Sequence, residues 1–76
     1  MFNTTILTAK RMIYQAPARS VFLPGSDGEF EVLEFHKPIV SLLRLGKIVV
    51  DWATEIPIKR GVMRMKGDEL VAIVEE

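Results

Sequence analysis

The chain has 76 residues, in which ten lysines and arginines balance ten aspartates and glutamates, and it contains no cysteine. This neutral balance argues against a nucleic-acid module, and the lack of cysteine excludes a disulfide framework and fits a reducing compartment. One histidine excludes a multi-histidine metal site, and no apolar run approaches the roughly 20 residues that span a bilayer. The length predicts one domain over residues 1–76.

Hydrophobic residues recur with a period of two along most of the chain, which is typical of β-strands. In chain order, the pattern predicts strands at 2–7, 11–16, 19–23, 30–33, 39–43, 47–52, 55–59, 62–66 and 69–74. Within 39–43 a single helical turn competes with a strand. Pro17 is expected to end the second strand, and Pro57 to lie on an edge or at a bulge. These frequent reversals predict an all-β fold, a flattened antiparallel β-sandwich or barrel of about 8–10 short strands.

The stretch Leu23–Pro38 stands out because two turn dipeptides, Pro24-Gly25 and Asp27-Gly28, lie between strand-like runs. Two turn signals this close predict a tight, exposed and acidic corner. Ser26 in this corner lacks the Gly-x-Ser-x-Gly spacing of a nucleophile elbow, and nothing in the sequence pairs it with His36. The sequence therefore predicts no catalytic residue, no metal site and no cofactor.

The last strand is apolar on both of its faces. Leu70, Ala72 and Val74 are expected to face the core, so Val71 and Ile73 point the other way. Two interpretations stay open: the strand is central and buried on both sides, or the second face is an exposed patch for a partner. The second interpretation also predicts weak self-association of the isolated chain.

Much of the chain follows the pattern Leu-Pro-Gly-x-x-Gly-x-x-Gly-Val-Leu-Pro-x-His-x-Pro-Leu-Val and the Leu-x-x-Gly segment after it. The matching residues are Leu23-Pro24-Gly25, Gly28, Val32-Leu33, His36, Pro38-Ile39-Val40 and Leu43 to Gly46. In these residues the chain resembles the N-terminal β domain of the epsilon subunit of rotary F-type ATP synthases. It departs from the pattern at Glu31, where the family has glycine, and at Glu34-Phe35, which replace Pro-Gly.

The resemblance implies a non-catalytic subunit of the central stalk, which couples gamma to the membrane c-ring in a proton- or sodium-translocating ATP synthase. Such a subunit is peripheral, on the cytoplasmic or equivalent matrix or stromal side of the membrane. Carried over by position, the loop of Ser26, Asp27, Gly28, Glu29 and Phe30 is expected to face the c-ring. His36, Leu42 and Leu43 are expected to face gamma.

Members of the family that the chain resembles usually continue into a C-terminal helical hairpin. This chain is expected to lack the hairpin, because it stops after its last strand, either as a naturally short form or as a truncated one. An alternative reading comes from the one basic cluster, formed by Lys59, Arg60, Arg64 and Lys66. With Trp52 or Phe22 nearby, this cluster resembles the surface of small β-barrels that bind single-stranded nucleic acid.

Overall fold

The computed structural model describes residues 1–76 and contains nine strands and no helix. The strands are β1 (Phe2–Leu7), β2 (Met12–Ala18), β3 (Ser20–Gly25), β4 (Gly28–Leu33), β5 (Ile39–Leu43), β6 (Gly46–Val50), β7 (Thr54–Ile58), β8 (Arg60–Lys66) and β9 (Glu69–Glu75). The predicted all-β sandwich is confirmed, and residues 39–43 form a strand rather than a helical turn. The chain has no helix of the length and apolarity needed to cross a bilayer.

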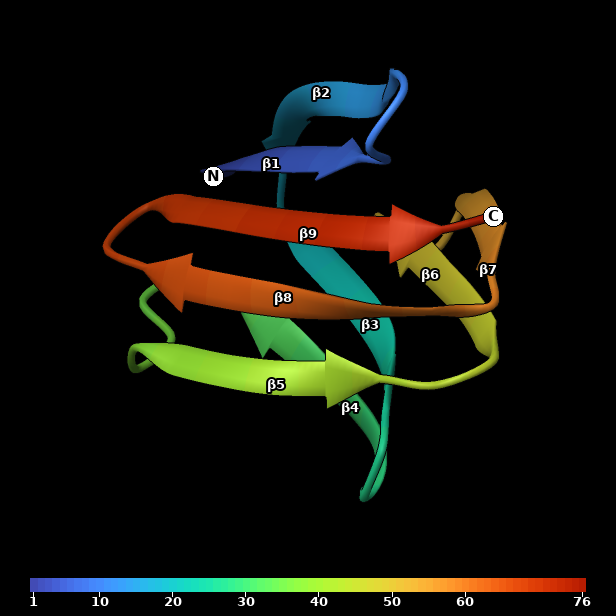
Figure 1. The fold of residues 1–76 in the computed structure, drawn as a ribbon. Coiled ribbons are helices and arrows are strands. Elements are labelled where there is room, and N and C mark those ends of the chain that lie inside the picture. Colours follow the sequence, from blue (N-terminus) through green and yellow to red (C-terminus); the bar gives the residue numbers. More distant parts are fainter.

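The strands form one sheet in the order β2-β1-β9-β8-β5-β3-β6-β7, with β4 paired to the other side of β3. The sheet folds over between β5 and β3, so that β3, β4 and β6 lie behind β1, β9, β8 and β5 (Figure 1). We call β2, β1, β9, β8 and β5 the front layer, and β4, β3, β6 and β7 the back layer. One pairing departs from the antiparallel prediction, because β1 and β9 run parallel.

A narrow joint connects the two layers. Only Gly25 of β3 pairs with Leu43 of β5, and two hydrogen bonds flank this pair. The Ser26 amide donates to the Leu42 carbonyl at 2.9 Å, and the Arg44 amide donates to the Pro24 carbonyl at 2.8 Å. A Cβ atom on Gly25 would lie 2.6 Å from the Gly28 carbonyl oxygen, so this joint requires glycine.

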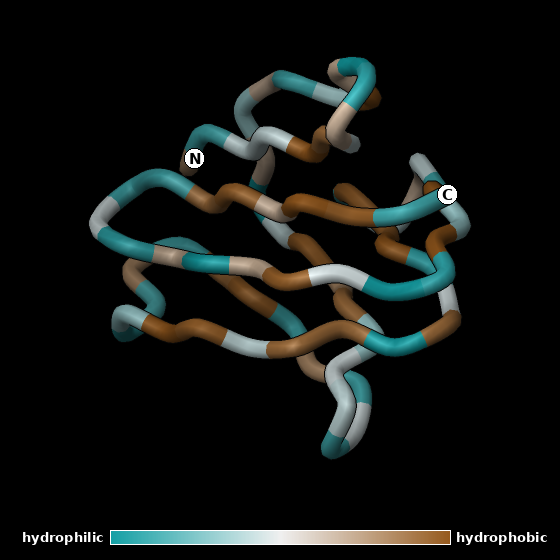
Figure 2. Tube along the Cα trace, viewed as in Figure 1, coloured by the Kyte–Doolittle hydropathy of each residue, from teal (hydrophilic) through white to brown (hydrophobic).

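The core lies between the layers and is built from alternate residues of the strands. Leu70, Ala72 and Val74 of β9 are buried in it, as predicted. Met63 and Met65 of β8 also point inward and are fully buried, so neither belongs to the outer face. Figure 2 shows that β5 is hydrophobic along most of its length, whereas the turns at the ends of the sandwich are hydrophilic.

The prolines and one turn correct the predicted boundaries. Pro17 does not end its strand but lies inside β2, which tolerates proline because β2 is at one end of the sheet. Pro57 lies in β7 at the other end, and its predicted edge position is confirmed. Trp52 was expected in a strand, yet β6 stops at Val50 and a turn follows. Pro24-Gly25 was expected to form a turn, but both residues belong to β3.

Candidate binding surface

The predicted corner is a hairpin between β3 and β4 whose tip is formed by Ser26 and Asp27. Both tip residues and Glu29 are exposed, and Gly28 has a φ of 135°, which favours glycine. Phe30 is only partly exposed, because its ring packs on the core and lies where a side chain on Gly25 would be. The corner thus presents two carboxylates and a hydroxyl at its tip.

The residues that depart from the family pattern differ in the backbone conformation that they adopt. Glu31 lies in the extended strand β4 and has no positive φ, so no glycine is required there. Its carboxylate accepts a 2.5 Å hydrogen bond from the buried hydroxyl of Ser20. Phe35 differs, because its φ is 64° and its side chain is 93% exposed. The departure from Pro-Gly therefore places an aromatic residue in the left-handed region.

Leu42 and Leu43 point to opposite faces of β5. Leu42 is 65% exposed on the outer face, whereas Leu43 is 4% exposed and belongs to the core. The prediction that both leucines face a partner is therefore wrong for Leu43, because successive side chains of a strand alternate. Leu42 lies next to the corner, since its carbonyl accepts the Ser26 amide.

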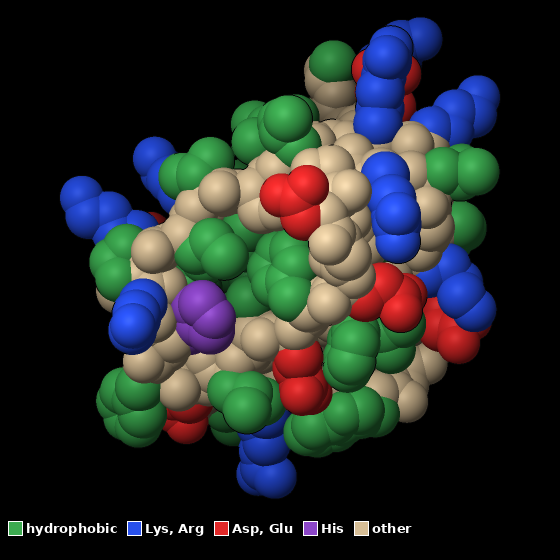
Figure 3. Space-filling model, turned by 90° about the horizontal axis from the view of Figure 1, so that it is seen from below, with side chains coloured by type: hydrophobic (Ala, Val, Ile, Leu, Met, Phe, Trp, Pro, Cys, Tyr) green, Lys and Arg blue, Asp and Glu red, His purple; other side chains and the backbone are tan.

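His36 lies in the connection between β4 and β5, at the far end of β5 from Leu42. It is half-buried, its Nδ1 atom lies 2.7 Å from the Lys37 carbonyl, and it lines a shallow groove of about 480 Å³ with Phe35 and Asp68. Seen from below, the histidine borders a hydrophobic patch (Figure 3). The structure thus places Leu42 in β5 and His36 in the connection before it, and the two residues line different grooves.

The outer face of the front layer carries a row of apolar side chains, of which Ile73 was predicted from the sequence. The register pairs Leu42 with Val62, Val62 with Ile73, and Ile73 with Leu7. Leu42, Val62 and Ile73 are exposed, and Leu7 is half-buried. We call these four residues the outer row. Of the two interpretations of β9, the structure favours the exposed patch, because no element covers Ile73.

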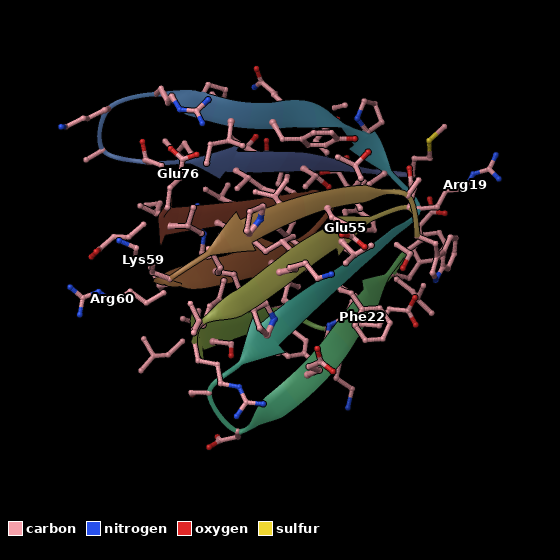
Figure 4. All side chains as sticks on the ribbon, turned by 90° about the vertical axis from the view of Figure 1, so that its right-hand side faces the viewer. Arg19, Phe22, Glu55, Lys59, Arg60 and Glu76 are labelled. Atoms are coloured by element: carbon pink, nitrogen blue, oxygen red, sulfur yellow. The ribbon has the colours of Figure 1, made fainter.

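An open groove of about 1010 Å³ lies along the outer row, between the β1–β2 turn and the corner. Two ion pairs border it: Arg60 Nε lies 2.9 Å from a Glu75 carboxylate oxygen, and Arg11 pairs with Glu76. Figure 4 shows Lys59, Arg60 and Glu76 gathered at one end of the molecule, with Arg19 at the other. The groove has an apolar floor and a charged rim, which makes it a candidate binding surface.

The basic cluster of the alternative reading lies along β8 and the turn before it. Arg60 and Lys66 occupy opposite ends of β8, and Arg60 is paired with Glu75. Arg64 lies between them on the outer face, next to Val40 and Val71 in the register. Arg60, Arg64 and Lys66 share the exposed face of β8, but Val62 separates Arg60 from Arg64. Because Glu75 pairs with Arg60, only Arg64 and Lys66 are adjacent unpaired cations on that face.

The family model described as the ATP synthase delta/epsilon chain beta-sandwich domain matches residues 1–76. The chain belongs to this family. The resemblance to the N-terminal β domain of the epsilon subunit, drawn above from the corner residues, is thereby confirmed.

Relatives agree with this membership. The chain is 35% identical over 79 residues to the ATP synthase epsilon chain of Sulfurovum sp. strain NBC37-1, a match that covers 99% of this chain and 62% of the relative. It is 38% identical over 74 residues to the epsilon chain of Sulfurimonas denitrificans, covering 92% of this chain and 57% of the relative. The chain thus spans less than two thirds of the length of these relatives.

Solved structures share the fold. A chain in the Euglena gracilis mitochondrial ATP synthase, solved with OSCP, F1 and c-ring, superposes with a TM-score of 0.82 at 20% identity, over 96% of this chain and 49% of that one. A chain from the central stalk and c-ring of the Tetrahymena thermophila enzyme gives 0.81 at 8% identity, over 97% and 63%. At these identities the comparison supports the sandwich architecture.

Proposed function

We propose that the chain acts as a non-catalytic component of the central stalk of a proton- or sodium-translocating ATP synthase, where it couples gamma to the membrane c-ring. It would work as a peripheral subunit on the cytoplasmic or equivalent side of the membrane. Membership in the delta/epsilon family supports this proposal. The observation that carries it is one continuous surface, which runs from the acidic corner through Leu42 to the outer row.

The corner is the end of this surface that suits the c-ring. Asp27 and Glu29 are exposed, and neither forms an ion pair within the chain. Free carboxylates at the tip of a hairpin are available to basic or polar groups of a partner. Ser26 and Gly28 complete the tip, whereas Phe30 supports it from the core side. We expect Glu29 to make the main polar contact.

β5 leads from the corner to the part of the surface proposed to face gamma. Leu42 lies beside the corner, and His36 lies before the start of the same strand. The joint at Gly25 holds the corner on β5, so torque applied to one part passes to the other through hydrogen-bonded backbone. The chemistry of ATP synthesis would take place in other subunits.

The proposal is tested by co-purification of the tagged chain with gamma and the c-ring from the same source. The wild-type chain should retain both, Glu29→Lys should lose the c-ring, and His36→Ala should weaken gamma. Glu69→Lys is a matched control, because Glu69 is exposed at the opposite end of the front layer. Failure of the wild-type chain to retain either partner would contradict the proposal.

A further inference from the structure

The outer row is a straight apolar band that crosses four strands. Its members follow one another across β5, β8, β9 and β1 in register, so their side chains stand side by side. With strands about 4.8 Å apart, the band is about 14 Å long and perpendicular to the strands. The pitch of an α-helix is about 5.4 Å, so about ten residues of helix laid along the band match its side chains turn by turn.

The acidic and basic residues beside the outer row differ in whether they form ion pairs within the chain. The acids that line the groove are already neutralised, because Glu75 pairs with Arg60 and Glu76 pairs with Arg11. Lys10 lines the same groove and is exposed without an ion pair. On the other side of the row, Arg64 is exposed and unpaired between Val40 and Val71. The free charge along both flanks of the band is therefore positive, and the free carboxylates of Asp27 and Glu29 lie beyond its Leu42 end, in the corner.

From these two observations we propose that the outer row binds an amphipathic α-helix of a partner subunit, which lies across the strands and carries acidic residues beside its apolar stripe. This inference rests on the proposed function and assigns the gamma-facing contact to Leu7, Val62 and Ile73 in addition to Leu42. The apolar stripe of the helix packs on the row, and its flanking carboxylates pair with Lys10 and Arg64.

The test titrates the full chain with two synthetic peptides of about 18 residues, long enough to form a helix. Both carry leucines at positions i, i+3, i+4 and i+7; one has glutamates and the other lysines on the flanks. The glutamate peptide is expected to bind at least about tenfold more tightly at low salt, and high salt should reduce this difference. Equal affinity of the two peptides, or binding of neither, would overturn the proposal.

Matched variants locate the contact. Leu42→Asp should weaken binding of the glutamate peptide about tenfold or more, as expected for a buried apolar anchor. Leu45→Asp is the control, because Leu45 is also an exposed leucine but lies outside the outer row. Arg64→Glu should reverse the preference between the peptides. Equal effects of the two leucine variants would place the peptide elsewhere and contradict the proposal.

Two further outcomes separate the proposal from its alternatives. If sedimentation shows a dimer of the chain that Leu42→Asp disperses, the occupant of the row is a second copy and the proposal is wrong. If gamma co-purifies equally with the wild-type chain and with Leu42→Asp, only the assignment of the outer row to the gamma contact is overturned. If the wild-type chain fails to retain gamma but still binds the glutamate peptide, the proposed function is wrong, whereas the assignment of the outer row as a helix-binding surface still holds.

Discussion

The outer faces of the two layers differ in whether their side chains have partners within the chain. On the back layer, Glu31 bonds the Ser20 hydroxyl at 2.5 Å, and Lys47 pairs with Glu55 at 3.1 Å. Phe22 and Val49, which lie between these pairs in the register, are half-buried. On the front layer, the outer row is apolar, and no element of the chain covers Leu42.

This difference separates a back layer that supports the fold from a front layer that we propose binds a partner. The polar contacts of the back layer are made within the chain, so substitutions there should change the free energy of unfolding. The front layer leaves apolar side chains and free cations exposed, so substitutions there should change binding. Pro17 in β2 and Pro57 in β7 disfavour the pairing of further strands at these two ends of the sheet.

Among substitutions in the back layer, the largest effect is expected from Asp51→Ala at its end. Asp51 and Trp52 have φ values of 52° and 56°, and the Asp51 carboxylate accepts hydrogen bonds from the Arg19 and Ser20 amides at 2.7 and 3.1 Å. Loss of these bonds should reduce the free energy of unfolding by about 2–3 kcal/mol in urea denaturation. Asp68→Ala, in a turn where the side chain makes no such bonds, should cost under about 0.5 kcal/mol; equal losses would contradict this account.

Glu31→Ala should have the next largest effect, because it leaves the buried Ser20 hydroxyl without an acceptor. We expect a loss of about 1–2 kcal/mol, measured by the same denaturation. Glu29→Ala, on the same strand but exposed, is the matched control. The double variant Ser20→Ala/Glu31→Ala should recover part of the loss, since no unsatisfied hydroxyl remains. An additive double variant would show that the hydrogen bond is not the cause.

Phe35→Gly, in the connection between the two layers, is expected to stabilise the chain. The φ of 64° destabilises a residue with a side chain by about 1–2 kcal/mol relative to glycine. The ring of Phe35 is 93% exposed, so its packing does not offset this cost. Thermal unfolding should therefore shift upward, by the equivalent of about 1 kcal/mol. Leu45→Gly, at an exposed residue without positive φ, should be neutral or destabilising. A loss of stability in Phe35→Gly would show that its ring contributes to folding.

The alternation of apolar residues was enough to predict the strands and much of the core, because each strand has one buried face. It predicted Leu70, Ala72 and Val74 correctly. The same rule applied to β5 would have separated Leu42 from Leu43. The turn at Asp51 and Trp52 was not predictable, because it depends on hydrogen bonds to Arg19 and Ser20, which are distant in sequence.

The corner was found from a local motif, whereas the outer row depends on the pairing of distant strands. Ile73 meets Leu7 only because β1 and β9 pair in parallel, and no local pattern encodes that pairing. Val62 and Ile73 lie on one hairpin, so their pairing can be predicted from the sequence. Their alignment with Leu42 depends on the register of β5 on β8, which the sequence does not give. Surface rows of this kind therefore emerge only with the tertiary fold.

The smallest effect on stability, and the sharpest contrast with the back layer, is expected for Leu42→Ser. Leu42 is mostly exposed, so its replacement should change the free energy of unfolding by less than about 0.5 kcal/mol. Leu43→Ser, one residue away but buried in the core, should cost about 3 kcal/mol or more. Parallel urea denaturation of the two variants measures this difference directly. A large loss of stability in Leu42→Ser would mean that the outer row supports the fold, and the division between scaffold and binding surface would then fail.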